Sequence, residues 1–361
     1  DYWLSSPRWS PQGNAIYFIQ EGDEGTSIRK IAVSPEDGKS SKASTPILEG
    51  RQIGADFALA NDGKRLFYTQ GPSYINIWQA TLEDSEKGQK VDVKQLTTGT
   101  TVHQGPCFSP DGKFIAYNTA IGNSANIYVM PAGGGPPQQI TFLNSWCTLP
   151  AWSPDGKEIA FFSNQGGSAK IWKVSAAGGQ PHPFAKTKGA SWPIWAPGHR
   201  ILYRASQNNN LWFIDPVTED EIPLFEKNPT SSPRWPRYSP DGKKIAAIWA
   251  RESEKETGLW LISLDASSSV MLRKGRALPL GWSADGKWIY ISEGSAAKFE
   301  VLAISSETGQ SKPWLSLPPN SEMGQVMSLF CSTDNGTHFV FSARRSQPDI
   351  WVAENFDPEI K

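Results

Sequence analysis

Four aspartates share nearly identical surroundings and are the first residues to consider as acid–base groups or metal ligands. Each lies in a Ser-Pro-Asp-Gly or Ser-Ala-Asp-Gly run after an aromatic residue, as in "WSPDGK" starting at Trp152. In such a run proline fixes φ, aspartate can bond the backbone ahead of it and glycine adopts a positive φ, so the run forms a tight turn. Because the runs recur at wide intervals, we interpret their aspartates as turn residues: Asp111, Asp155, Asp241 and Asp285.

Residues for nucleophilic, metal or phosphate chemistry do not occur at the required spacings. The Gly-x-Ser-x-Gly elbow of serine hydrolases is absent, and "GASWP" at Gly189 lacks its last glycine. No Cys-x-x-Cys or Asp-x-Asp-x-Asp pattern is present, and no Gly-Lys-Ser/Thr follows the glycine-rich segments "AGGGPP" and "AAGGQP". The four histidines lie in four different repeats, at His103, His182, His199 and His338. We therefore expect no catalytic residue, no metal site and no cofactor.

The turn is part of a repeat that fills the chain. Its glycine recurs with spacings of 42 to 50 residues. The clean copies read "FSPDGK", "WSPDGK" and "YSPDGK", whereas the outer copies are weaker, as expected at the ends of a repeat array. The eight copies predict one domain over residues 1–361, with turn glycines at Gly13, Gly63, Gly112, Gly156, Gly198, Gly242, Gly286 and Gly336.

Each repeat contains the pattern of four short strands. A Pro-x-aromatic strand precedes the turn, an apolar strand such as "EIAFFS" follows it, and a third strand carries an aromatic, as in "KIWKVS". A weaker strand completes the unit, with turn residues throughout and no helical periodicity. Four antiparallel strands per repeat are typical of a propeller blade. We therefore expect an all-β, eight-bladed β-propeller built of four-stranded antiparallel blades.

The repeat "PxWSPDGKxIAFxS…xIWxxxxxGGxxxxLT" resembles that of TolB-type propellers, which are relatives of the WD repeat, over nearly the whole chain. The ending "DIWVAENFDP" is similar to the last blade of sensor propellers in bacterial receptor-type serine/threonine kinases and membrane-bound regulators. This resemblance implies an extracytoplasmic sensor or scaffold domain, in the periplasm or at the cell surface, that is attached to or associated with other domains. Prolyl-oligopeptidase-type serine peptidases carry similar propellers, and the chain has no room for their hydrolase domain.

Charge and hydropathy exclude two classes of partner. Lys and Arg total 35 and Asp and Glu total 36, which gives a net charge of −1. A nucleic-acid surface needs a clustered excess of basic residues, so we expect no nucleic-acid partner. No apolar run reaches the roughly 18 residues that a membrane-spanning helix requires. A protein, peptide or small-molecule ligand at one propeller face is the expected partner.

Ligand contacts in a propeller should gather where the innermost strands begin, at one mouth of the central channel. The segments a few residues before each motif aromatic contain more Trp and Arg than blade packing requires. These residue types dominate binding hot spots, and Trp also suits stacking on sugars or peptides. Capping of the core is the alternative role for the same tryptophans. The candidate ligand-binding residues are Trp3, His103, Trp146, Trp192, Arg234, Trp235, Arg237 and Arg276.

Three functions stay open at this point: a non-enzymatic binding module, the gating propeller of a serine peptidase, and an enzyme with its site in the channel, such as a lyase. The absence of an acid–base cluster makes the enzyme the weakest of the three. A calcium ion in the channel is compatible with a propeller, although no ligand spacing supports one. We also expect residues 1–6 to lie where the ring closes, either as part of the innermost strand of the first blade or added to the eighth, with Trp3 packed between the first and last blades.

Overall fold

The computed structural model describes residues 3–22, 25–41, 43–50, 53–71, 73–85, 88–184, 187, 189–196, 198–251, 257–275, 277–295, 298–317, 323, 325–332, 337–346 and 349–357. Contacts group the chain into two compact units, Asp1–Ser73 with Arg345–Lys361, and Tyr74–Arg344. Strands dominate both units. The described residues contain one short helical turn, η1 (Gln165–Gly167), and no helix long and apolar enough to cross a membrane.

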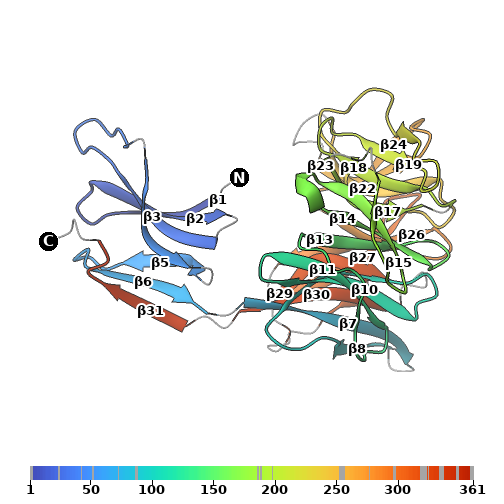
Figure 1. Cartoon of the computed structure of the whole chain (residues 1–361), viewed down its shortest axis with the longest axis horizontal. Coiled ribbons are helices and arrows are strands. Elements are labelled where there is room, and N and C mark those ends of the chain that lie inside the picture. Colours follow the sequence, from blue (N-terminus) through green and yellow to red (C-terminus); the bar gives the residue numbers. More distant parts are fainter. Residues whose placement is uncertain are drawn as a thin grey trace. The chain divides into compact units, whose positions relative to one another are not determined.

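The first unit consists of two antiparallel sheets. One sheet has four strands in the order β1 (Trp3–Trp9), β2 (Ala15–Gly22), β3 (Gly25–Ala32) and β4 (Thr45–Gly50). The other has three strands in the order β5 (Ile53–Leu59), β6 (Arg65–Gln70) and β31 (Asp349–Glu354). A shared core between them contains Tyr17, Ile28, Phe57 and Leu66. Figure 1 shows β31 beside β6, so the end of the chain completes a sheet begun near its start.

A buried carboxylate holds the segment after β31 against the first sheet. Asp357 is 3% exposed and forms a 2.6 Å ion pair with Lys30, and it also accepts a hydrogen bond from the hydroxyl of Tyr17. Removing one partner from a buried ion pair leaves the other charge uncompensated, which is costly. Asp357 therefore ties the chain's two ends into one unit.

The second unit contains five sheets formed by consecutive strands. The first is β9 (Val102–Phe108), β10 (Phe114–Ile121), β11 (Ser124–Pro131) and β12 (Gln138–Gln139). The second is β13 (Cys147–Trp152), β14 (Glu158–Ser163), β15 (Lys170–Ser175) and β16 (His182–Pro183). The remaining three are β17 (Ala190–Trp195), β18 (Ile201–Ala205), β19 (Leu211–Ile214) and β20 (Glu221–Pro223); β21 (Arg234–Tyr238), β22 (Lys244–Ala250), β23 (Thr257–Ser263) and β24 (Ser269–Lys274); and β25 (Leu278–Trp282), β26 (Trp288–Ser295), β27 (Lys298–Ser305) and β28 (Ser311–Ser316).

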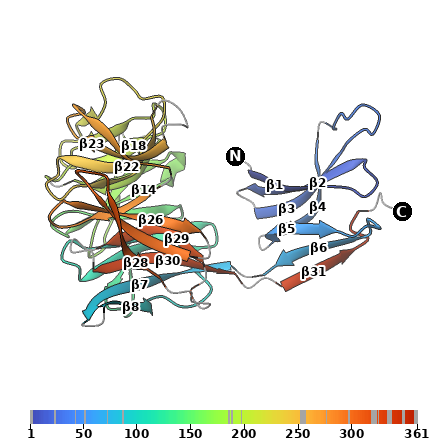
Figure 2. The same cartoon turned by 180° about the vertical axis from the view of Figure 1, so that it is seen from behind.

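A sixth blade combines strands from both ends of this unit. Its two inner strands are β29 (Gln325–Ser332) and β30 (His338–Ser346), and its two outer strands are β7 (Ser73–Ser85) and β8 (Gly88–Gln95). Figures 1 and 2 show β7 beside β30 from opposite sides. A single parallel bridge between Ile75 and Val102 links this blade to β9, which is why the two blades form one continuous sheet of eight strands.

The six blades close into a ring. Going round it, each innermost strand lies against the next, from β9 through β13, β17, β21 and β25 to β29 and back to β9. Among the described residues, a separate apolar cluster fills each of the six spaces between neighbouring blades. In the closing blade, Trp78 packs with Tyr290 on one face and Ile77 packs with Tyr117 on the other. Successive side chains of a strand point to opposite faces, so β7 fills both neighbouring cores at once.

The motif turns have the predicted conformation. The seven turn glycines in the described part of the chain have φ between 67° and 93°. At Asp111 the carboxylate accepts hydrogen bonds from the Ser109 hydroxyl at 2.6 Å and the Lys113 backbone N–H at 3.1 Å. Both bonds lower the pKa of the Asp111 carboxyl, and the bond from Ser109 has the larger effect. The same hydroxyl–carboxylate contact recurs at Asp155, Asp241 and Asp285, which confirms these aspartates as turn residues.

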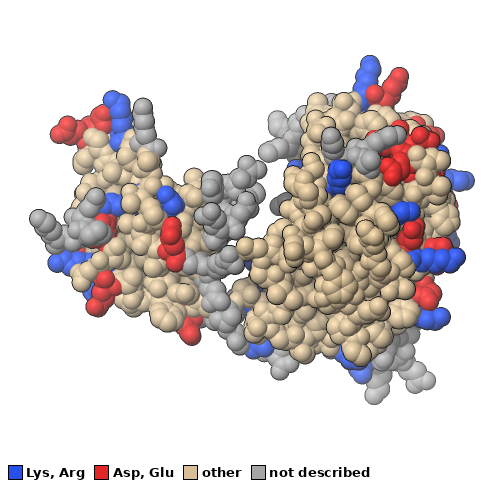
Figure 3. Space-filling view, viewed as in Figure 1, with Lys and Arg blue, Asp and Glu red and all other residues tan. Residues whose placement is uncertain are grey.

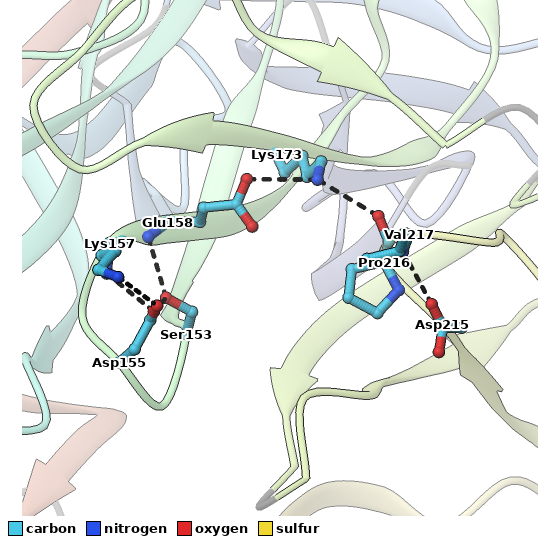
Figure 4. A network of polar contacts seen from close by, with 8 residues as sticks. All are labelled: Ser153, Asp155, Lys157, Glu158, Lys173, Asp215, Pro216 and Val217. Atoms are coloured by element: carbon cyan, nitrogen blue, oxygen red, sulfur yellow. Dashed lines mark hydrogen bonds and ion pairs between the residues drawn. The ribbon is translucent and has the colours of Figure 1, made fainter.

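Polar contacts also join neighbouring blades. Figure 4 shows Lys173 of β15 between the carboxylate of Glu158, 3.2 Å away, and the carbonyl oxygen of Pro216 in the next blade, 3.3 Å away. Only about a quarter of the Lys173 side chain is exposed. One lysine therefore bridges two strands of its own blade and the outer hairpin of its neighbour.

The prediction of eight four-stranded blades is not confirmed. The described strands form seven sheets, and the ring in the second unit has six blades. In sequence, β7 follows β6 and β31 follows β30, yet β6 pairs with β31 and β7 pairs with β30. The third strands of the second and eighth repeats have thus exchanged places. Whether the eight repeats make a single domain stays a prediction.

Both exchanged strands keep the register that the other blades use. Trp351 lies opposite Tyr68, as Trp172 lies opposite Phe161 and Trp212 opposite Tyr203. The Leu82 N–H donates to the Thr337 carbonyl at 2.7 Å, and counting from this bond in antiparallel register would place Trp78 opposite Phe341. Strand β31 pairs with β6 in a continuous register without a bulge.

Residues 3–6 belong to the innermost strand of the first sheet, which is one of the two predicted placements, but they do not close the ring of the second unit. Strand β1, which begins at Trp3, pairs with β2 inside the first unit. The ring is closed instead by β7 and β8, because β30 offers an open edge that β7 can occupy with a full apolar face.

Two tryptophans at equivalent repeat positions test the closure. Trp78 is 4% exposed in the ring, whereas Trp351 is 50% exposed on β31. Trp78→Ala should lower the free energy of unfolding by about 3–5 kcal/mol, since it empties a packed core. Trp351→Ala should lower it by less than about 1 kcal/mol. Urea denaturation followed by circular dichroism measures both, and equal losses would contradict the arrangement.

Candidate functional site: the central channel

The innermost strands of the second unit surround a cavity of about 810 Å³. Its described lining comes from β9, β13, β17, β21 and β25, and β29 completes the ring of strands. Each lining strand ends in its motif turn, so the turns gather at one end of the channel and the strand starts at the other. A cavity of this size is within the range of small-ligand sites.

Four of the lining strands carry the same irregularity. The pairing with the second strand shifts register at an x-Pro step, where one strand has extra residues opposite its partner. Such bulges re-aim side chains and often lie next to functional sites. The residue before each proline has a positive φ: 63° at Gly105, 57° at Leu149, 54° at Trp192 and 50° at Trp235.

Two of these bulge residues are tryptophans, which are sterically disfavoured at positive φ. Only glycine adopts a positive φ without steric cost, and other residues held there lose about 1–3 kcal/mol. The rings of Trp192 and Trp235 stack with centroids 5.2 Å apart and planes inclined by 23°. Both line the channel. The bulges therefore hold two large flat surfaces inside the cavity at the expense of local backbone strain.

Two arginines accompany the tryptophan pair. Arg204 on β18 is paired with Ser191, the neighbour of Trp192, and its guanidinium lies 6.0 Å from the centre of the Trp192 ring. Arg234 directly precedes Trp235 and is exposed. The Nε of Arg204 is buried without a hydrogen-bond partner. Burial, and then the charge of Arg234, lower the pKa of Arg204.

Of the predicted ligand-binding residues, Trp192, Trp235 and Arg237 line the channel, and Arg234 lies beside them. The guanidinium of Arg237 donates to the carbonyls of Leu280 at 3.2 Å and Pro236 at 3.1 Å. Arg237 thus joins β21 to β25. Its role in the described structure is to hold two blades together.

The other predicted residues lie apart from the tryptophan pair or outside the description. His103 is near the start of β9, where its Nδ1 is 3.0 Å from the Thr119 hydroxyl and its ring meets the edge of Tyr117. Trp146 is 42% exposed just before β13 and does not line the cavity. Trp3 begins β1 in the first unit, but its side chain lies outside the described residues, as does all of Arg276.

Sequence reasoning missed Arg204 and Asn118. Both stand six residues after a turn glycine, opposite the bulge of their own blade. Asn118 is 2% exposed, its Nδ2 has no partner, and its Oδ1 lies close to Gly105. A polar residue at this position of an otherwise apolar strand, as in "FIAYN" and "ILYRA", is the signal that could have found them.

The described residues contain no group of three or more His, Cys, Asp or Glu side chains that could hold a metal ion. Burial raises the pKa of the Cys147 thiol, which keeps it protonated, and the Cys107 thiol donates to the Pro150 carbonyl at 3.1 Å. Figure 3 shows acidic and basic side chains along the margin of the second unit, around a wide uncharged area on the face seen. The described lining offers the aromatic surfaces of Trp192 and Trp235, and the guanidinium of Arg204 lies beside the first of them.

A TolB-type propeller is the class of protein that this ring of repeats defines. The chain belongs to the TolB beta propeller domain family, which matches residues 16–284. Matched in structure, a TolB-like protein of Agrobacterium tumefaciens has a TM-score of 0.58 and 19% identity over 77% of this chain and 100% of that one. TolB of Acinetobacter baumannii has a TM-score of 0.52 and 14% identity over 91% of this chain and 79% of that one. These likenesses show the fold.

One curated relative is similar in sequence. YuxL of Bacillus subtilis (strain 168), described as an uncharacterized peptidase, is 28% identical over 146 residues. The match covers 32% of this chain and 22% of that protein, so this chain spans about a fifth of the relative's length. The similarity to sensor propellers of receptor kinases stays a prediction.

The histidine at the channel mouth gives a pH test. Burial lowers the pKa of His103, and that of His338 on β30, below the ordinary value of 6.5. As pH falls, the unfolded chain therefore binds protons before the folded one does, and stability present above the unfolded pKa is lost below it. His103→Gln should reduce the loss of stability between about pH 7.5 and about pH 5. The exposed His182 provides the control variant, His182→Gln, and an unchanged pH profile in His103→Gln would contradict the assignment.

Proposed function

We propose that this chain is a non-enzymatic binding module that presents one mouth of its six-bladed ring to a protein, peptide or small-molecule ligand. The observation that supports this most is the Trp192–Trp235 stack, 5.2 Å between centroids, held at positive φ inside the channel. Strained residues persist where the surrounding structure imposes them, and they cluster at functional sites. Packing alone does not explain two tryptophans where glycine serves in the blade of β9.

Residues for hydrolysis do not come together in the described part of the chain. His103 contacts a threonine and a tyrosine, so in the described structure it is not paired with an acidic residue in the manner of a catalytic triad. These observations favour binding over catalysis. The proposal includes an extracytoplasmic location, in the periplasm or at the cell surface, as the sensor or scaffold part of a bacterial signalling or envelope protein, and this part rests on the family alone.

The gating propeller of a prolyl-oligopeptidase-type serine peptidase is the alternative. The description of YuxL as a peptidase is the observation in its favour, although the match covers 22% of that protein. The complete gene discriminates the two: a downstream Gly-x-Ser-x-Gly domain supports the peptidase, and a membrane helix with a kinase or DNA-binding domain supports the sensor.

A peptide and metabolite array probed with the purified chain tests the binding function. Ligands found by the wild type should bind the Trp192→Ala and Trp235→Ala variants about tenfold or more weakly, since removing a stacking tryptophan at a hot spot costs about 2 kcal/mol. Trp351→Ala, in the other unit, is the matched control and should bind like the wild type.

A parallel assay tests the absence of catalysis. The chain should not react with a serine-directed fluorophosphonate probe and should not cleave peptide or ester substrates. Turnover that survives repurification and disappears on mutation of one serine or cysteine would overturn the proposal, as would ligands that bind both channel variants as tightly as the wild type.

A further inference from the structure

Two arginines at the channel mouth carry positive charge that no acidic side chain balances. Within the part of the chain that the structure describes, neither Arg204 nor Arg234 forms an ion pair or a hydrogen bond through its guanidinium. Their charges repel each other, and the Arg204 Nε has lost its water without gaining a partner. Arg204 is half-buried and Arg234 is exposed, so the unsatisfied group is the buried Arg204 Nε–H, and an anion that reaches both guanidinium groups would offset their repulsion.

The position of the two arginines relative to the tryptophan rings restricts the chemical class of the ligand further. Arg204 lies over the Trp192 ring at 6.0 Å, and Arg234 is the residue before Trp235. Each cation therefore accompanies one member of the stacked pair. Guanidinium groups bind carboxylates and phosphates through paired N–H donors, and tryptophan faces bind flat rings.

From this juxtaposition, we propose that the channel mouth binds a small molecule or terminal group in which a carboxylate or phosphate is attached to a flat ring. The ring lies against Trp192 or Trp235, and the anionic group is held by Arg204 and Arg234. This inference rests on the proposed binding function and names its ligand class. Trp192 and Trp235 line the cavity of about 810 Å³, which can admit the ring of such a ligand, and Arg204 and Arg234 lie outside that lining, where they can reach the anionic group.

Probe pairs in which one member carries a carboxylate or phosphate and the other is neutral provide the test. Indole-3-acetate is compared with indole-3-acetamide, and phenyl phosphate with phenol, by isothermal titration calorimetry. At least one charged probe should bind about tenfold or more tightly than its neutral partner, the gain expected of a charge-assisted hydrogen bond. Added salt should weaken that preference. The two pairs separate carboxylate from phosphate.

Arginine variants assign the preference to the site. Arg204→Met should abolish most of it, and Arg234→Gln, at an exposed position where folding is not at risk, should reduce it. Arg200→Gln, exposed in the same blade just before β18, is the matched control and should leave the preference unchanged.

The failures of the two proposals are distinguishable. Equal binding of the charged and neutral probes, failure of every charged probe to bind, or a preference that survives in both Arg204→Met and Arg234→Gln would overturn the anion site. The array of ligands can still return Trp192-dependent binders in each of those cases, and then the binding function stands. If no ligand on the array depends on Trp192 or Trp235, both proposals fail.

Discussion

The pairing of β7 with β30 is the interaction on which the rest of the second unit depends. It supplies the outer half of the sixth blade and places Trp78 and Ile77 in the cores on either side of that blade. Without it, β30 would expose an open edge and two apolar faces, which is a pairing liability. Because every other blade in the ring is built from consecutive strands, this is the one closure that joins distant parts of the sequence.

The closed ring surrounds the strained bulges of the channel with packed strands. The bulges at Trp192 and Trp235 require the surrounding strands to hold two large residues at positive φ. Contacts such as the hydrogen bonds of Arg237 to β25, and the Trp282 indole to the Arg237 carbonyl at 3.0 Å, fix neighbouring inner strands to one another. The aromatic pair and the two arginines therefore lie on the paired strands β17, β18 and β21, and ligand binding does not require these strands to fold or rearrange.

Local chemistry made part of this structure predictable from sequence. The Ser-Pro-Asp-Gly turns, the four-stranded blades and the position of Trp192 and Trp235 in the channel lining all follow from residues close together in the chain. The blade count does not, because "NIWQA" in β7 and "DIWVA" in β31 have the same pattern and fit either sheet in the same register. Arg204 could not be predicted as a site residue because it lies within the apolar strand "ILYRA". The apolar residues around it indicate a strand of the core.

The most direct test of the account is which strand lies beside β6. Val352 of β31 stands opposite Phe67, and Gln79 of β7 would take that place if the repeats paired in sequence order. Phe67→Cys is combined with either Val352→Cys or Gln79→Cys, and the disulfide formed under mild oxidation is located by peptide mapping. The account predicts a cross-link between positions 67 and 352 and none between 67 and 79; a cross-link between 67 and 79 would contradict it.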